Sequence, residues 1–156
     1  MYRTLKLFHL GGLTLFLGSI LTYVLISAQI EGATLEQIAF GRAIISMGTR
    51  DLTLPGLWLL IISGIGLGYL REGQQRPYLK LKLLLAALII SNAYLLVVPA
   101  ATSATVLAEH SVMMGQLSAG YQPAYLRETI FGALNVVLTC VLAVLGVWKM
   151  GANTEK

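Results

Sequence analysis

The sequence contains few charged residues and a single cysteine. Asp, Glu, Lys and Arg make up 12% of its 156 residues and hydrophobic residues make up 56%, whereas about a quarter of a typical soluble domain is charged. A soluble fold of this size cannot bury so much apolar surface, but a bilayer acts as a solvent for it. The lone Cys140 excludes an internal disulfide, and the Cys-x-x-Cys-His motif of covalent c-type haem is missing.

Several enzyme and transporter signatures are missing as well. The sequence has no Gly-x-Ser-x-Gly, no His-Glu-x-x-His and no phosphate-binding loop. Its hydrophobic runs contain no pair of acidic residues and no clear half-repeat, which argues against ion-coupled transport. The net charge is +4, yet no run of Lys or Arg forms a patch, so nucleic acid is not expected as a partner.

Four hydrophobic runs predict the fold. They cover residues 5–30, 52–70, 79–98 and 125–150, and about 20 residues at 1.5 Å per residue cross about 30 Å of hydrocarbon. The first run is too long for the apolar core of a signal peptide, so we expect it to be a retained helix. The sequence therefore predicts an all-α protein, a four-helix transmembrane bundle that forms one integral membrane domain over residues 1–156.

The links between these runs carry further signals. Asp51 is expected to cap the second span and to pair with a nearby arginine, with Pro55 in the first turn. Pro99 is expected to close or kink the third span. Mainly hydrophobic residues recur at near-helical spacing in the first and third links, which predicts helical extensions beyond the membrane or helices on its surface. These residues are Leu35, Ile38, Ala39 and Ile45, and Val106, His110, Met113, Met114 and Leu117.

The basic residues indicate the topology. The second link, residues 71–82, contains four Lys or Arg and one Glu, and further basic residues lie near both ends of the chain. By the positive-inside rule, this places the amino terminus, the second link and the carboxyl terminus in the cytoplasm. Four spans satisfy this alternation, with the lipid bilayer as the first partner of the protein.

His9 is the first candidate site residue. It lies about one turn inside the first span, and Gly12, three residues further on, leaves space for a flat ligand against the helix. Neutral imidazole is the usual axial ligand of b-type haem in membrane helices, which makes His9 the candidate metal ligand. The alternative is a histidine that sits among lipid headgroups or hydrogen-bonds to a neighbouring helix.

Lys82 is the second candidate, and counting along antiparallel helices places it at the same depth as His9. Its helix face continues through Ala86, and both residues face the bundle if their small-residue stripes do. An ammonium group at this depth snorkels, pairs or is neutral. A neutral amine can ligate a metal and a charged one can bind a carboxylate, so the predicted cofactor site comprises His9, Gly12, Lys82 and Ala86.

Other polar and small residues are expected to serve packing. Asn92 lies at mid-membrane and is expected to hydrogen-bond across helices, and Gly64 and Gly68 form a small-xxx-small pair. His110 lies at the outer side, away from His9. The neighbouring methionines, Met113 and Met114, suit either packing or a soft metal such as Cu(I).

Three segments carry a resemblance to known families. The segments "LKLFHLGGLTLFLGSIL", "LPGLWLLIISGIGLGYL" and "YLKLKLLLAALIISNAYLLVVP" resemble three spans of small bacterial inner-membrane proteins. These are an uncharacterised predicted integral-membrane family, the copper-resistance D-type domain and the haem-dependent protoporphyrinogen oxidase. The resemblance to the oxidase implies roles for His9 and Lys82 in binding haem b. This sequence lacks the oxidase's aromatic-Leu-His-x-Lys histidine, having Lys80 in its place, and its later Tyr-His is replaced near residues 92–94.

The sequence thus supports one leading hypothesis and two alternatives. The leading one is a b-type haem-binding protein of the bacterial inner membrane, redox-active in electron transfer or in a protoporphyrinogen-oxidase-like reaction. The first alternative is a non-enzymatic accessory or assembly subunit that packs against a membrane partner or a second copy of itself. The least favoured is transport of copper or a small molecule. Whether the protein is an enzyme stays open at this point.

Overall fold

The computed structural model describes residues 2–72 and 77–148, with side chains described for 2–70 and 79–146. Within these ranges the chain contains helices and short links and no strand. Four helices are long and apolar enough to cross a membrane: Tyr2–Ile30, Leu35–Leu70, Leu79–Met114 and Tyr121–Gly146. The predicted all-α four-helix bundle is therefore confirmed.

Two of the four long helices are composite. The first and last are α1 (Tyr2–Ile30) and α6 (Tyr121–Trp148). The second consists of α2 (Leu35–Gly48), a π-helical turn η1 (Thr49–Thr53) and α3 (Leu54–Glu72). The third consists of α4 (Pro77–Asn92), a π-helical turn η2 (Ala93–Val97) and α5 (Val98–Met114). Of the two expected arrangements of the long links, the structure shows helical extensions, because α2 and α5 continue the helices of α3 and α4.

A proline accounts for each π-helical turn. In an α-helix, the ring of proline clashes with the carbonyl group four residues earlier. A π-helical turn widens the backbone just before Pro55 and Pro99, so that the N–H of Leu54 donates to the oxygen of Thr49 and the N–H of Val98 to that of Ala93. The helix therefore continues through both prolines, so Pro99 does not close its span, which was one of the two outcomes expected for it.

The start of the second long helix also differs from the prediction. Asp51 does not cap a helix, because it lies inside η1, but it does pair with Arg50 at the exposed surface, Nε to Oδ1 at 2.8 Å. The cap is Thr34, whose side chain accepts from the backbone N–H of Gln37 while the Gln37 side chain accepts from that of Thr34. This reciprocal arrangement is a capping box, and it begins the helix well before residue 52.

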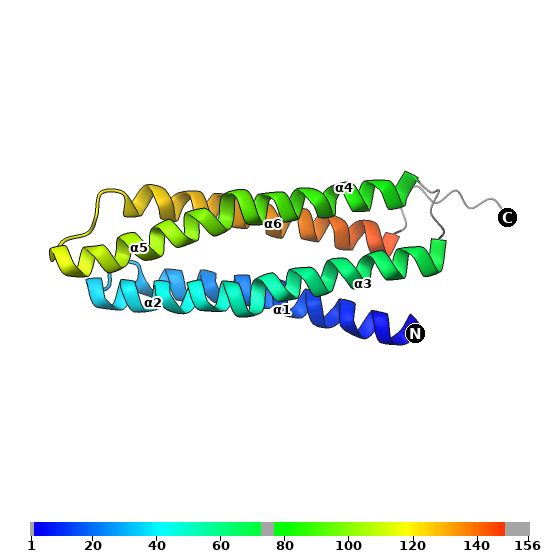
Figure 1. Ribbon diagram of the computed structural model, residues 1–156, viewed down its shortest axis with the longest axis horizontal. Coiled ribbons are helices and arrows are strands. Elements are labelled where there is room, and N and C mark those ends of the chain that lie inside the picture. Colours follow the sequence, from blue (N-terminus) through cyan, green and yellow to red (C-terminus); the bar gives the residue numbers. More distant parts are fainter. Residues whose placement is uncertain (1, 73–76, 149–156) are drawn as a thin grey trace.

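The helices form two layers (Figure 1). One layer consists of α1 beside α2 and α3, and the other of α4 and α5 beside α6. Gly12 and Gly56 allow α1 and α3 to approach closely, since a Cβ at Gly12 would lie 2.6 Å from the backbone nitrogen of Leu60. We call the end with the start of α1 and the end of α3 the cavity end, and the end with α2 and α5 the link end.

The outer surface of the bundle is apolar along most of its length. Large side chains such as Leu7, Leu25 and Leu95 are exposed, Leu95 to 71%. Soluble proteins do not tolerate contiguous apolar surface of this extent, whereas lipid tails do. The four long helices and the apolar surface are consistent with a multi-pass membrane protein. At 1.5 Å per residue, the two composite helices are each about 54 Å long, so they extend beyond about 30 Å of hydrocarbon.

A candidate cofactor cavity

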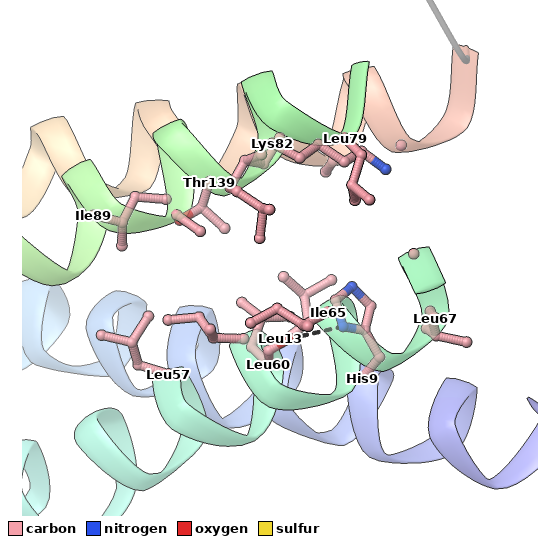
Figure 2. Close-up of a pocket in the computed structure, with 18 of the residues that line it drawn as sticks. His9, Leu13, Leu57, Leu60, Ile65, Leu67, Leu79, Lys82, Ile89 and Thr139 are labelled. Carbon is pink, nitrogen blue, oxygen red and sulfur yellow. Dashed lines mark hydrogen bonds between the residues drawn. The ribbon is translucent and has the colours of Figure 1, made fainter. Parts of the chain in front are cut away.

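A cavity of about 370 Å³ lies between the two layers at the cavity end (Figure 2). This volume falls within the usual range of small-molecule sites, about 300–1,000 Å³. The walls are mainly apolar and come from α1, α3, α4 and α6. They include Leu13, Leu57, Leu60, Ile61, Ile65, Leu83, Ile89, Leu142 and Ala143. His9, Lys82 and Ala86 line the same cavity, so the structure brings together three of the four residues predicted for the site.

The imidazole of His9 is held by α3. Its Nδ1 lies 3.0 Å from the carbonyl oxygen of Leu60 and 3.1 Å from Oγ of Ser63. A carbonyl oxygen only accepts, so we assign the hydrogen to Nδ1, which donates to Leu60. In the neutral ring the lone pair then lies on Nε2, and Figure 2 shows this second nitrogen pointing across the cavity towards α4. Metal-binding histidines use the same arrangement, in which a bond from one nitrogen orients the other.

Gly64 makes room for the ring. A Cβ at this position would lie 3.1 Å from Cε1 of His9, tighter than an ordinary van der Waals contact, so the ring would have to shift by a few tenths of an ångström. Gly68, its partner in the small-xxx-small pair, faces Leu79, with a Cβ position 2.7 Å from Cδ1. Both glycines therefore pack within this chain, and replacing them would disturb the cavity rather than test for a partner helix.

Lys82 projects towards the mouth of the cavity. Figure 2 shows its side chain running along α4 past Leu79, and its Nζ would lie 3.7 Å from a Cβ at Gly146 on α6. This is the snorkelling conformation of a lysine near a helix end, with the stem against apolar side chains and the amine towards the polar edge. Of the two roles considered for Lys82, contact with a ligand's acidic group fits this direction better than coordination opposite His9.

Sequence reasoning missed two further residues at the rim. Lys6 and Tyr2 also line the cavity, and Nζ of Lys6 lies 4.8 Å from the centre of the Tyr2 ring. The basic residues near the amino terminus, Lys6 among them, served in the sequence analysis only as topology signals. The position of Lys6 three residues before His9, and so on the same helix face, was the signal that could have placed it there.

The remaining predicted residues lie elsewhere. Gly12 is buried at the contact between α1 and α3, where it permits close packing, and it does not line the cavity. His110, Met113 and Met114 are exposed on α5 at the link end, Met113 to 77%. The two methionines therefore do not pack in the core, and His110 does not approach His9.

Beyond the cavity, the predicted bond of Asn92 across the helices is confirmed. Its Nδ2 donates to Oδ1 of Asn135 at 2.7 Å and to the carbonyl oxygen of Phe131 at 2.8 Å. A hydrophobic cluster of Phe16, Leu57, Ile89 and Ala93 lies beside this pair. Since Leu57 and Ile89 also line the cavity, this cluster forms its floor.

The link end contains a second polar group that the sequence did not indicate. Arg42 on α2 is fully buried and forms an ion pair with Glu128 on α6 through Nη2 and Oε2. The guanidinium carbon lies 6.0 Å from the centre of the Tyr125 ring, which stacks on Tyr121. Arg42 lies outside the predicted spans and Glu128 near the start of the fourth, and the structure pairs them inside the bundle.

Among the described residues, no group of three or more His, Cys, Asp or Glu could hold a metal ion. A haem iron needs only an axial ligand from the protein, because the porphyrin supplies the other nitrogens. No protein-family model, curated protein or solved structure matches the chain. The class of multi-pass membrane protein rests on the fold, and a narrower function rests on the cavity.

Proposed function

We propose that the protein binds b-type haem in this cavity, with His9 as the axial ligand. The observation that carries the proposal is the hydrogen bond from Nδ1 of His9 to Leu60 at 3.0 Å. It leaves Nε2 as the ligating atom and directs it into an apolar cavity between two helix layers. Oriented imidazole and a surrounding apolar shell are what a b-type haem requires of its protein.

The charges at the mouth of the cavity suit the acidic edge of haem. The apolar macrocycle would lie among the leucines of α1 and α3, and the two propionates would lie near the amines of Lys6 and Lys82. Ala86, a small residue one turn from Lys82, leaves space beside the ring. The protein's part is to bind, orient and shield the group; bound iron would supply one-electron chemistry, for electron transfer or an oxidase-like reaction.

The proposed location is the bacterial inner membrane with both termini in the cytoplasm. The support is the exposed basic residues Arg3, Lys6 and Lys80 at the cavity end, which the positive-inside rule assigns to the cytoplasm. The segment resemblances described above agree with this location. The cavity would then open on the cytoplasmic side.

An absorption spectrum tests the proposal. Wild type expressed with ample haem is expected to show a Soret band that is lost or shifted in His9→Ala. His110→Ala is the matched control, because His110 is exposed at the link end, and it should keep the wild-type spectrum. Wild type without a Soret band, also after incubation with haemin, would contradict the proposal.

The alternative proposal is a non-enzymatic subunit that packs against another membrane helix. Gly11 and Gly18 favour it, since a Cβ at either position would meet nothing within 4 Å, and small residues on a free face allow helices to approach. Gly11→Leu with Gly18→Leu should then break a copurifying complex, while the spectrum of any bound pigment stays the same.

A further inference from the structure

The two helix layers meet very differently at their two ends. At the link end, α2 packs along α5, and buried residues including Ile38, Ala104 and Ala108 form a shared core. At the cavity end, α3 and α4 touch at few places, and the cavity lies between them. The floor around Phe16 and Leu57 separates the cavity from the link end. The structure is thus a bundle that is open at one end and closed at the other.

The buried ion pair belongs to the closed end. Arg42 and Glu128 come from different layers, so their bond holds the layers together. Thr105 on α5 adds a second link, with its hydroxyl donating to the backbone oxygen of Arg42 at 3.4 Å. Arg42 lies 22 residues from Gly64 along its helix, and Thr105 lies 23 from Lys82. At 1.5 Å per residue, the ion pair is about 33–35 Å from Gly64 and Lys82, close to the hydrocarbon thickness of a bilayer.

This closure leaves polar groups unsatisfied. Arg42 is 0% exposed, and its Nε and Nη1 have no hydrogen-bond partner among the described residues. Buried donors without acceptors cost free energy that hydration would restore. Parting the layers at the link end would admit water to these nitrogens and to Glu128. The closed end therefore includes a charged group that favours opening, balanced by apolar packing and one ion pair.

Each composite helix also has a site at which it can bend. The turns η1 and η2 lie 11 to 15 residues from Gly64 and Lys82, respectively, and so at the same level between the cavity and the ion pair. π-helical turns and prolines interrupt the regular backbone hydrogen bonds and are common sites of helix bending. Two matched bends at one level allow the layers to rock against each other.

From these observations we propose that the cavity has alternating access. In the second conformation the link end parts at Arg42 and Glu128, and the cavity end closes over Lys6 and Lys82. The protein would then be a carrier for an amphiphilic acid, whose apolar body fits the leucine-lined walls and whose carboxylate meets the two amines. The inference goes beyond haem binding, since it uses the same cavity but needs no iron. The sequence argued against ion-coupled transport because its hydrophobic runs lack paired acids, whereas the carrier proposed here rests on the buried Arg42–Glu128 pair and needs no coupling ion.

Cysteine labelling at both ends tests the proposal. In a Cys140→Ala background, a single cysteine is introduced either at Ala108, which is 0% exposed at the link end, or at Ala86 in the cavity. Each purified protein is labelled in detergent with a water-soluble maleimide. Glu128→Gln removes the negative charge opposite Arg42 and should raise the labelling rate at position 108 about tenfold. It should lower the rate at position 86, because opening one end closes the other.

A second variant, called the locked variant, is designed to keep the link end closed. Arg42→Leu with Glu128→Leu replaces the ion pair by apolar side chains, a change that buried pairs tolerate well. It should slow labelling at position 108 and raise it at position 86. Faster labelling at position 108 with no change at position 86 in Glu128→Gln would indicate local opening only and would overturn the proposal. Labelling rates in the locked variant that equal those of wild type would also overturn the proposal. Labelling needs no haem, so these results are independent of the absorption spectrum.

Discussion

Nδ1 of His9 lies 3.0 Å from the carbonyl oxygen of Leu60, a residue 51 positions away in the sequence. The bond joins the first span to the second and determines which imidazole nitrogen faces the cavity. It is possible only because Gly12 and Gly56 let α1 and α3 come close together. Helix packing thus prepares the histidine for coordination, and the first prediction concerns the glycine beside its ring.

Gly64→Ala is expected to weaken haem binding by about 10–100-fold, the usual effect of disturbing a residue that orients a metal ligand. The added methyl group would lie 3.1 Å from Cε1 of His9 and force the ring to move. Haemin titration followed at the Soret band measures the affinity. Gly11→Ala is the control, since its Cβ meets nothing within 4 Å; equal losses in both variants would contradict the proposed geometry.

Lys6→Met and Lys82→Met are each expected to reduce haemin affinity by about 10–100-fold, since a charge-assisted hydrogen bond to a carboxylate contributes about 1.5–3 kcal/mol. Methionine keeps an apolar stem of similar length against the cavity wall. The dimethyl ester of haem has no carboxylates, so its affinity should be the same for wild type and variants. An equal loss with the ester would show that the lysines act through packing.

Removal of one partner of the buried ion pair should be far more damaging than removal of both. Arg42→Leu or Glu128→Leu alone should destabilise the protein by about 3–5 kcal/mol, because the remaining charge is buried without a partner. The double variant should be near wild type in free energy of unfolding. Thermal unfolding in detergent gives the comparison. The exposed pair provides the control, and Arg50→Leu should change stability by less than about 1 kcal/mol.

The bond between Asn92 and Asn135 should couple α4 to α6 modestly. A double-mutant cycle with Asn92→Leu and Asn135→Leu is expected to give an interaction of about 0.6–2 kcal/mol, the range of polar contacts between membrane helices. The two side chains are 2.7 Å apart and buried. Denaturant unfolding in mixed micelles measures the cycle, and additive single effects would exclude a direct bond.

Features that depend on local composition and on helix geometry were predictable. The four apolar spans follow from length and hydropathy, since about 20 residues must cross the hydrocarbon. The shared cavity of His9 and Lys82 agrees with counting residues at a fixed rise along antiparallel helices. Ala86 lines that cavity because it lies one turn from Lys82 on the same face.

Other features depend on contacts between segments far apart in the chain. Pro55 was taken as a helix start because its missing N–H is harmless there, but a π-helical turn accommodates it inside a longer helix. Gly12 was assigned to a ligand, although the neighbour it makes room for is α3. No local pattern distinguishes these alternatives, because each is consistent with the same residues.

The sequence by itself determined that this protein is a bundle of four helices long and apolar enough to cross a membrane, because hydrophobicity and helical rise are properties of each segment alone. It also determined which imidazole and which amine lie at the same depth. Only the tertiary structure decided that Leu60 orients His9 and that Arg42 and Glu128 meet inside the bundle. These pairings depend on how helices rotate about their axes and pack, and that rotation is set by all the contacts of the bundle together.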